Sequence, residues 1–196
     1  TVNAGKTSAS NSAGGIVTIQ SGASTQGRSG KIALNTLNGG VSGDIEMETG
    51  ATTGGTSGVI TFSTGKSTGG KGGSITLSVG EGETRIGGNV IINAGVSSGP
   101  SASTGGIVSI QSGESASTSS GAVSISTSTG GSNGVSGNIG LTTGDTTADS
   151  DTGTIAFTTG KSAGGKGGSI TLSDGEGNVG VGGDVSVSGG NTYTDG

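Results

Sequence analysis

The sequence contains no cysteine, no histidine and no tryptophan, and it has only one tyrosine, two phenylalanines and one proline. Without cysteine the chain forms no disulfide framework and carries no thiolate chemistry, which leaves its redox compartment open. Without histidine it lacks the commonest general base and metal ligand. Eight basic residues and almost no aromatic side chains provide neither a phosphate-binding groove nor a stacking platform, so we expect no nucleic-acid partner. No apolar run is long enough for a membrane span.

Glycine is abundant, with 48 of 196 residues, whereas 26% of the residues are hydrophobic and 11% are charged. Such a composition is typical of low-complexity or disordered chains. The apolar residues nevertheless recur at fixed offsets from glycine along the whole chain, which a disordered chain has no reason to maintain. The clearest case is GKSTGGKGGSITLSVGEGE at 65–83, which returns as GKSAGGKGGSITLSDGEGN at 160–178. Periodicity therefore predicts a repetitive fold.

The repeated unit is a glycine, any residue, a β-branched residue, any residue and a large apolar residue. It occurs twelve times, usually in steps of fifteen residues, with opening glycines Gly15, Gly30, Gly43, Gly58, Gly73, Gly88, Gly106, Gly121, Gly137, Gly153, Gly168 and Gly183. The two apolar positions of each unit form the predicted structural core: Val17, Ile19, Ile32, Leu34, Ile45, Met47, Ile60, Phe62, Ile75, Leu77, Val90, Ile92, Val108, Ile110, Val123, Ile125, Ile139, Leu141, Ile155, Phe157, Ile170, Leu172, Val185 and Val187.

Offsets of two place both apolar side chains on one face of a β-strand, with hydroxyl-rich residues such as Thr18, Thr61, Thr76 and Thr171 on the other. Each unit would bury roughly 3–6 kcal/mol of apolar side chain, whereas ordering the backbone costs roughly 1–2 kcal/mol per residue. No unit can fold alone, so the units must stack. The pattern predicts an all-β fold without helices, a repetitive β-solenoid (β-helix) of strand–turn units of about fifteen residues.

The size of one coil is open in the sequence. We favour thirty residues, with two facing parallel sheets. In that arrangement Leu77 packs beside Met47 and across the core from Phe62 or Ile92. A fifteen-residue coil is the first alternative, and an antiparallel sandwich is the second.

The sequence also has a second, longer period. Six of the fifteen-residue units make a superunit of about 91 to 95 residues that occurs nearly twice. We expect a truncated preceding repeat and turn at 1–14, a first superunit at 15–105 and a second at 106–196, in one continuous solenoid. The longest connection, 94–105, holds Pro100 in an expected rigid turn. Since the chain begins inside a repeat, we expect this sequence to be a segment of a longer repeat array.

The phrases GGSITLS, GGIVSIQSG and SGAVSISTS, separated by Gly/Ser/Thr-rich turns, resemble the giant repetitive β-solenoid surface proteins of algal and diatom type. More distantly, they resemble filamentous-haemagglutinin-like adhesins. The resemblance covers the whole chain. It implies a non-enzymatic structural protein located outside the cell or on its surface, and it transfers no catalytic residue. Such a protein is a segment of a long extracellular fibre, filament or surface appendage.

Few motifs suggest chemistry. Gly65-Lys66-Ser67 and its copy at 160–162 match the final Gly-Lys-Ser of a phosphate-binding loop. The glycine that this motif requires five positions earlier is absent, so we interpret both copies as turns. The GxGxxG at 175–180 lies among strands and turns, so we interpret it in the same way. Asp145, Asp149 and Asp151 share one connection and are the candidate ligands for Ca²⁺. We expect no cofactor, and calcium at these residues is the alternative.

Asp44, Glu46 and Glu48 line one outward strand edge, with a spacing comparable to that of the paired carboxylates of inverting glycosidases. The second superunit has Asn138 and Gly140 at the first two of these positions, so we interpret the acids as a charge that discourages aggregation. The expected partners are further repeats of this chain or identical chains in a filament, with polysaccharide or other matrix components as further candidates. The rival function is an adhesin or binding module that uses its Ser/Thr-rich face for polysaccharide or ice. An enzyme comes third, because no nucleophile and base can be assembled.

Overall fold

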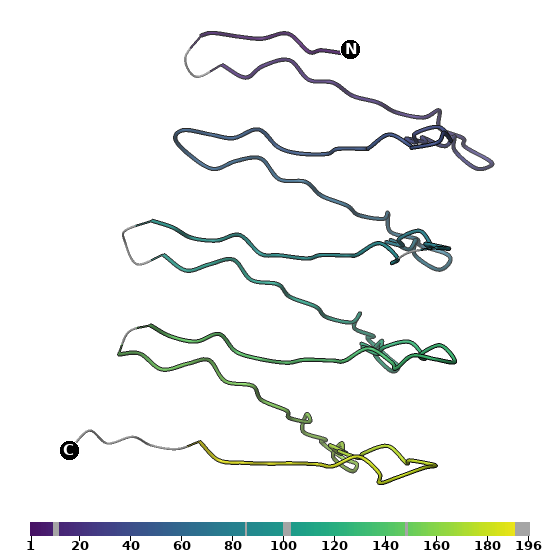
Figure 1. Ribbon diagram of the computed structural model, residues 1–196. Coiled ribbons are helices and arrows are strands. Elements are labelled where there is room, and N and C mark those ends of the chain that lie inside the picture. The colour runs from purple at the N-terminus through teal and green to yellow at the C-terminus, as the bar shows by residue number, and fades with distance from the viewer. Residues whose placement is uncertain (10–11, 85, 100–102, 148, 191–196) are drawn as a thin grey trace. The chain divides into compact units, whose positions relative to one another are not determined.

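The computed structural model describes residues 1–9, 12–84, 86–99, 103–147 and 149–190, and within these ranges it contains neither a helix nor a β-strand. The chain consists of extended segments that alternate with bends (Figure 1). The predicted all-β fold, a single-chain β-solenoid or β-helix with two facing sheets, is therefore wrong. Pro100 lies outside the described residues.

The physical reason is that, among the described residues, no extended segment has another segment as its hydrogen-bonding partner. A strand needs a neighbour about 4.8 Å away that exchanges N–H and C=O bonds with it. The described residues form six backbone hydrogen bonds, each between residues no more than eleven apart in sequence. A folded chain of this length has on the order of 200 hydrogen bonds. The thirty-residue coil, which requires Met47 and Leu77 on paired strands, is wrong for the same reason.

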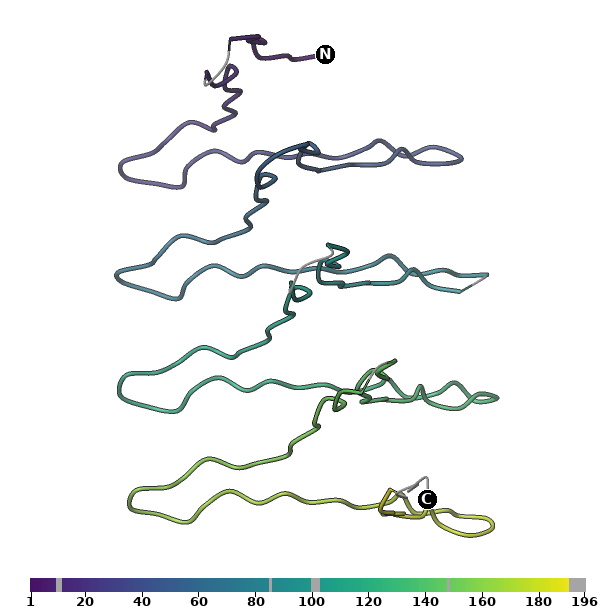
Figure 2. The same cartoon turned by 90° about the vertical axis from the view of Figure 1, so that its left-hand side faces the viewer.

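The chain divides into two units, Thr1–Ile92 and Asn93–Gly196. We name each extended segment by its opening glycine. In the first unit the Gly15 and Gly58 segments run in the same direction, and so do the Gly30 and Gly73 segments (Figure 1, Figure 2). One winding of the first unit therefore consists of three consecutive segments, which differ in direction.

The second unit, taken by itself, follows the same rule. Its Gly106 and Gly153 segments run alike, and the Gly121 and Gly168 segments run alike in another direction (Figure 2). The superunit of six repeats seen in the sequence corresponds to two such windings. The predicted division at residues 105 and 106 falls inside this second unit.

Each corner between segments depends on the opening glycine of the next segment. A Cβ atom added at Gly73 would lie 3.1 Å from the Cβ of Thr64, and one added at Gly168 would lie 3.2 Å from the Cβ of Thr159. At every one of the twelve opening glycines, an added Cβ would come within 3.6 Å of the residues that end the preceding segment. At Gly73, Gly168 and the other corners where this distance is 3.3 Å or less, glycine is needed for space, because a side chain would displace its neighbour.

Hydrogen bonds close several of these corners. The opening N–H of Gly30 donates to the carbonyl of Gly22 over 2.8 Å, and Gly121 donates to Gly113 over 2.9 Å. At two corners that lack this backbone bond, a threonine contributes: the Thr64 hydroxyl donates to the carbonyl of Gly73 over 3.3 Å, and the Thr159 hydroxyl donates to that of Gly168 over 3.4 Å. The same residue that packs on the glycine thus also bonds to it.

Alanine at an opening glycine should destabilise the fold, whereas alanine one position earlier should not. Gly73→Ala brings a methyl group against Thr64, and we expect it to lower the free energy of unfolding by about 1–3 kcal/mol. Gly72→Ala is the matched control, since a Cβ at Gly72 meets nothing within 4 Å. Thermal or denaturant unfolding measures both. Equal effects of the two variants would contradict the role of the corner.

Candidate functional site

The extended segments have two chemically distinct faces. Residues two and four positions after each opening glycine form what we call the apolar face, and residues one, three and five positions after it form the outer face. The β-branched residues of the apolar face are 45–57% exposed, and the larger apolar residues are 59–89% exposed. Val59 on the outer face is 85% exposed, whereas the adjacent Ile60 is 45% exposed. The two faces therefore differ even in a single chain.

None of the predicted core residues is buried, and the described part of the chain contains no buried side chain at all. The apolar face is partly covered by its own corners and otherwise open. Burial of these residues stays a prediction that requires something outside the single chain to cover them. An open apolar face repeated in every segment is the most prominent candidate binding surface of the molecule.

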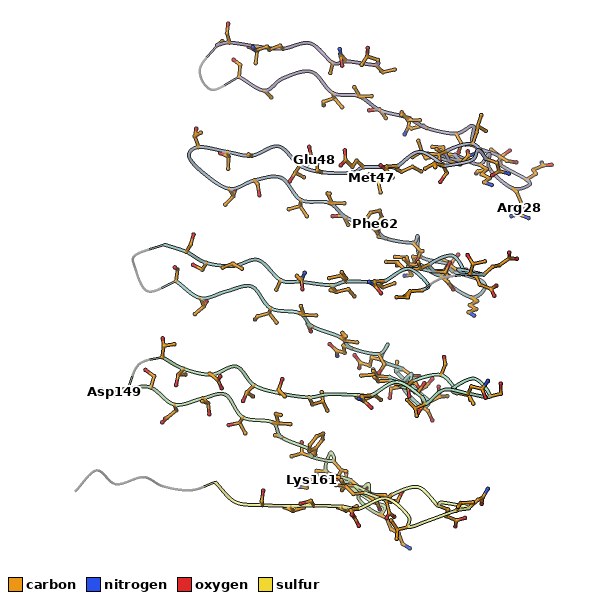
Figure 3. The ribbon with its side chains drawn as sticks, viewed as in Figure 1. Arg28, Met47, Glu48, Phe62, Asp149 and Lys161 are labelled. Carbon is orange, nitrogen blue, oxygen red and sulfur yellow. The ribbon has the colours of Figure 1, made fainter. Side chains whose placement is uncertain are left out.

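The first unit gathers this face around one apolar cavity. Met47, Phe62, Ile75, Thr76 and Leu77 line a space of about 410 Å³. They come from three consecutive segments, which open at Gly43, Gly58 and Gly73, so three sides of one winding face the same interior. Figure 3 labels Met47 and Phe62 on two of these segments. Thr76, predicted to point outward, borders the cavity beside the two apolar residues that flank it.

The outer face carries hydroxyl, amide and charged groups. Asp44, Glu46 and Glu48 alternate along the Gly43 segment and are all exposed. Figure 3 labels Glu48 beside Met47, its neighbour in the chain. No three acidic side chains within the described ranges come together in a way that could hold a metal ion, which applies to these three acids as well.

The candidate calcium ligands lie in one connection of the second unit. Asp145, Asp149 and Asp151 are exposed, and the structure does not gather them into a metal-binding group. Asp149 and Lys161 lie at opposite ends of the Gly153 segment (Figure 3). Ca²⁺ takes six to eight oxygen ligands, and calcium at these three residues stays a prediction.

The motifs that echo nucleotide-binding loops lie in turns. The hydroxyl of Ser162, in the second Gly-Lys-Ser, accepts a hydrogen bond from the backbone N–H of Gly165 over 2.9 Å. Ser24 accepts one from Gly27 over the same distance, so this is a recurrent turn. In the GxGxxG stretch, Gly180 adopts a positive φ of 94°, and a Cβ at Gly177 would lie 2.9 Å from the carbonyl oxygen of Val181. These glycines are required by a tight bend.

The sequence interpretation missed the residue six positions after each opening glycine, which packs against the next opening glycine. Val79 illustrates its effect: it stands outside the two apolar positions, yet it is only 48% exposed because it lies against Gly88. The signal was present in the sequence as a recurrent threonine at this position: Thr36, Thr49, Thr64, Thr127, Thr143 and Thr159.

Comparisons with protein-family models, with curated proteins and with solved structures find no match. The resemblance to algal and diatom surface proteins thus stays a prediction from the repeat pattern. Within the described ranges, no helix is both long and apolar enough to cross a membrane.

Calcium should not stabilise the chain. Because Asp145, Asp149 and Asp151 are not gathered, we expect millimolar Ca²⁺ and Mg²⁺ to shift the unfolding temperature equally, by general screening of the net charge of −5. Calorimetry with and without each ion measures the shift. A Ca²⁺-specific stabilisation that disappears in Asp149→Asn would contradict this expectation and establish the site.

Proposed function

We propose that the chain is a non-enzymatic structural protein, a segment of a long extracellular fibre, filament or cell-surface appendage. The observation that carries the proposal is the repetition of one corner twelve times, each with a glycine packed on the end of the preceding segment. A repeated corner lets a chain grow longer by adding windings, and no single repeat has a special role. Length and a hydrophilic exterior are the properties that this repetition supplies.

The distribution of polar groups supports the same function. Catalysis needs a nucleophile, a base and an orienting group within hydrogen-bonding distance of one another. The titratable side chains of the described residues are spread over connections and outer faces instead, as Arg28, Glu48, Asp149 and Lys161 illustrate (Figure 3). Their spacing suits a hydrated surface with a net charge of −5, which keeps neighbouring fibres apart.

The second candidate is an adhesin or binding module for polysaccharide or ice. It is favoured by the exposed Ser and Thr residues of the outer face, which recur at corresponding positions, for example Thr61, Ser63, Thr158 and Ser173. Regular hydroxyl groups can hydrogen-bond an ordered surface. The acids on the Gly43 segment interrupt this regularity, so we rank the structural function first.

Immunoelectron microscopy distinguishes a surface fibre from other roles. An antibody raised against the purified chain should label filaments or surface appendages of the source cells, in rows along their length. Pre-immune serum is the control. Label confined to the cell interior would refute the proposal, whereas label at contact points with a substrate, without filaments, would favour the adhesin.

A further inference from the structure

We propose that three copies of this chain wind together around one axis, so that the windings of each copy lie between the windings of the other two. This inference deepens the proposed function by naming the partner that makes the fibre. Pairing here joins different chains, and it is distinct from the single-chain solenoid that the structure excludes. It rests on the open apolar face, the unpaired backbone, the repeated pattern of the segments and the three-sided winding.

A single chain leaves far more surface open than a folded protein does. Its solvent-accessible surface is 19511 Å², whereas a folded monomer of 18.0 kDa exposes about 8,000 Å². The excess is on the order of 10,000 Å², compared with about 800 Å² per partner in an interface of standard size. A defined winding without buried side chains cannot offset the conformational entropy of about 1–2 kcal/mol per residue. The covering surface must therefore be extensive and follow the whole chain.

A second copy of the chain is a partner that matches the extended segments. Each segment keeps the same order of opening glycine and two apolar positions, although the connections between segments vary in length. Any segment of a second copy therefore presents the same apolar face, and its free N–H and C=O groups match those of a segment of the first copy.

The number of copies follows from the winding. Three consecutive segments with different directions complete one winding, and Met47, Phe62 and Ile75 face one interior from its three sides. A threefold axis along the winding maps these sides onto one another and gives a closed assembly of identical chains, whereas a twofold axis does not. The same axis directs the apolar faces of all three copies into the common interior.

The threefold arrangement also sets which segments meet. Because each copy is rotated by one side, a segment lies beside the next segment of a neighbouring copy, with opening glycines aligned. Lys31 and Asp44, both one position after their glycines, then become neighbours of opposite charge. If each segment instead paired with the identical segment of another copy, Asp44, Glu46 and Glu48 would lie against the same acids, and this repulsion is unfavourable.

The first test is the mass of the purified chain in solution, measured by light scattering or sedimentation equilibrium. We expect about 54 kDa, three times the chain mass of 18.0 kDa. Ile60→Asp, which puts a carboxylate into the shared interior, should lower the mass about threefold. Val59→Asp, the adjacent residue on the outer face, should keep the mass of the unsubstituted chain.

Three results would overturn the proposal: a monomer or another stoichiometry for the unsubstituted chain, a trimer that survives Ile60→Asp, or dissociation by Val59→Asp to the same extent. The control guards against a general effect of an added charge, since both variants change the net charge equally.

The second test maps the pairing by disulfides, which is straightforward because the chain has no cysteine of its own. Ser109 and Ser124 stand three positions after Gly106 and Gly121, so the proposal places Ser109 of one copy beside Ser124 of the next. Under oxidation, the double variant Ser109→Cys/Ser124→Cys should run as a covalent trimer in denaturing gels. Ser109→Cys alone should stay at the mass of one chain.

A covalent monomer in the double variant, or dimers of Ser109→Cys alone, would refute the pairing of successive segments. The outcome is separable from the proposed function. A trimer whose antibody labels no surface structure would retain the interwinding and remove the fibre function. A monomeric chain whose antibody labels surface filaments would do the opposite.

Discussion

The packing of an opening glycine against the end of the preceding segment is the contact on which the rest of the structure depends. It occurs at all twelve corners, and at most of them an added Cβ would lie closer than an ordinary van der Waals contact. The corner fixes the direction of the next segment and therefore which side chains share the apolar face. Because the contact is local, it forms within about fifteen residues of sequence and needs no sheet. This explains how a winding can be defined although the described residues form no buried core.

The extended segments and the corners could be predicted from the sequence, whereas the pairing of the segments could not. The offset of two between Ile60 and Phe62 predicted an extended segment with two faces, and the exposure of Val59 beside Ile60 shows that difference. The spacing of the glycines located the corners. The predicted sheets were wrong, because alternation tells which face of a segment is apolar and says nothing about which segment, or which chain, lies beside it.

Coil size was mispredicted for a related reason. Fifteen-residue and thirty-residue coils both assumed that a segment pairs within its own chain, so three-sided winding was not considered. Thr76 was expected to face solvent, and it is exposed, although it also borders the cavity between Ile75 and Leu77. The acidic residues were assigned to surfaces and connections, and the structure keeps Asp44 and Asp149 there.

The open apolar face also governs the kinetics of folding. In most small domains, a chain buries its own side chains, and the folding rate is independent of protein concentration. Here no side chain of the described residues is buried, so a chain gains little by ordering before it meets another. Folding should then be a reaction between molecules whose rate rises steeply with concentration. A cell could thus control where such a protein becomes ordered by controlling where its chains accumulate.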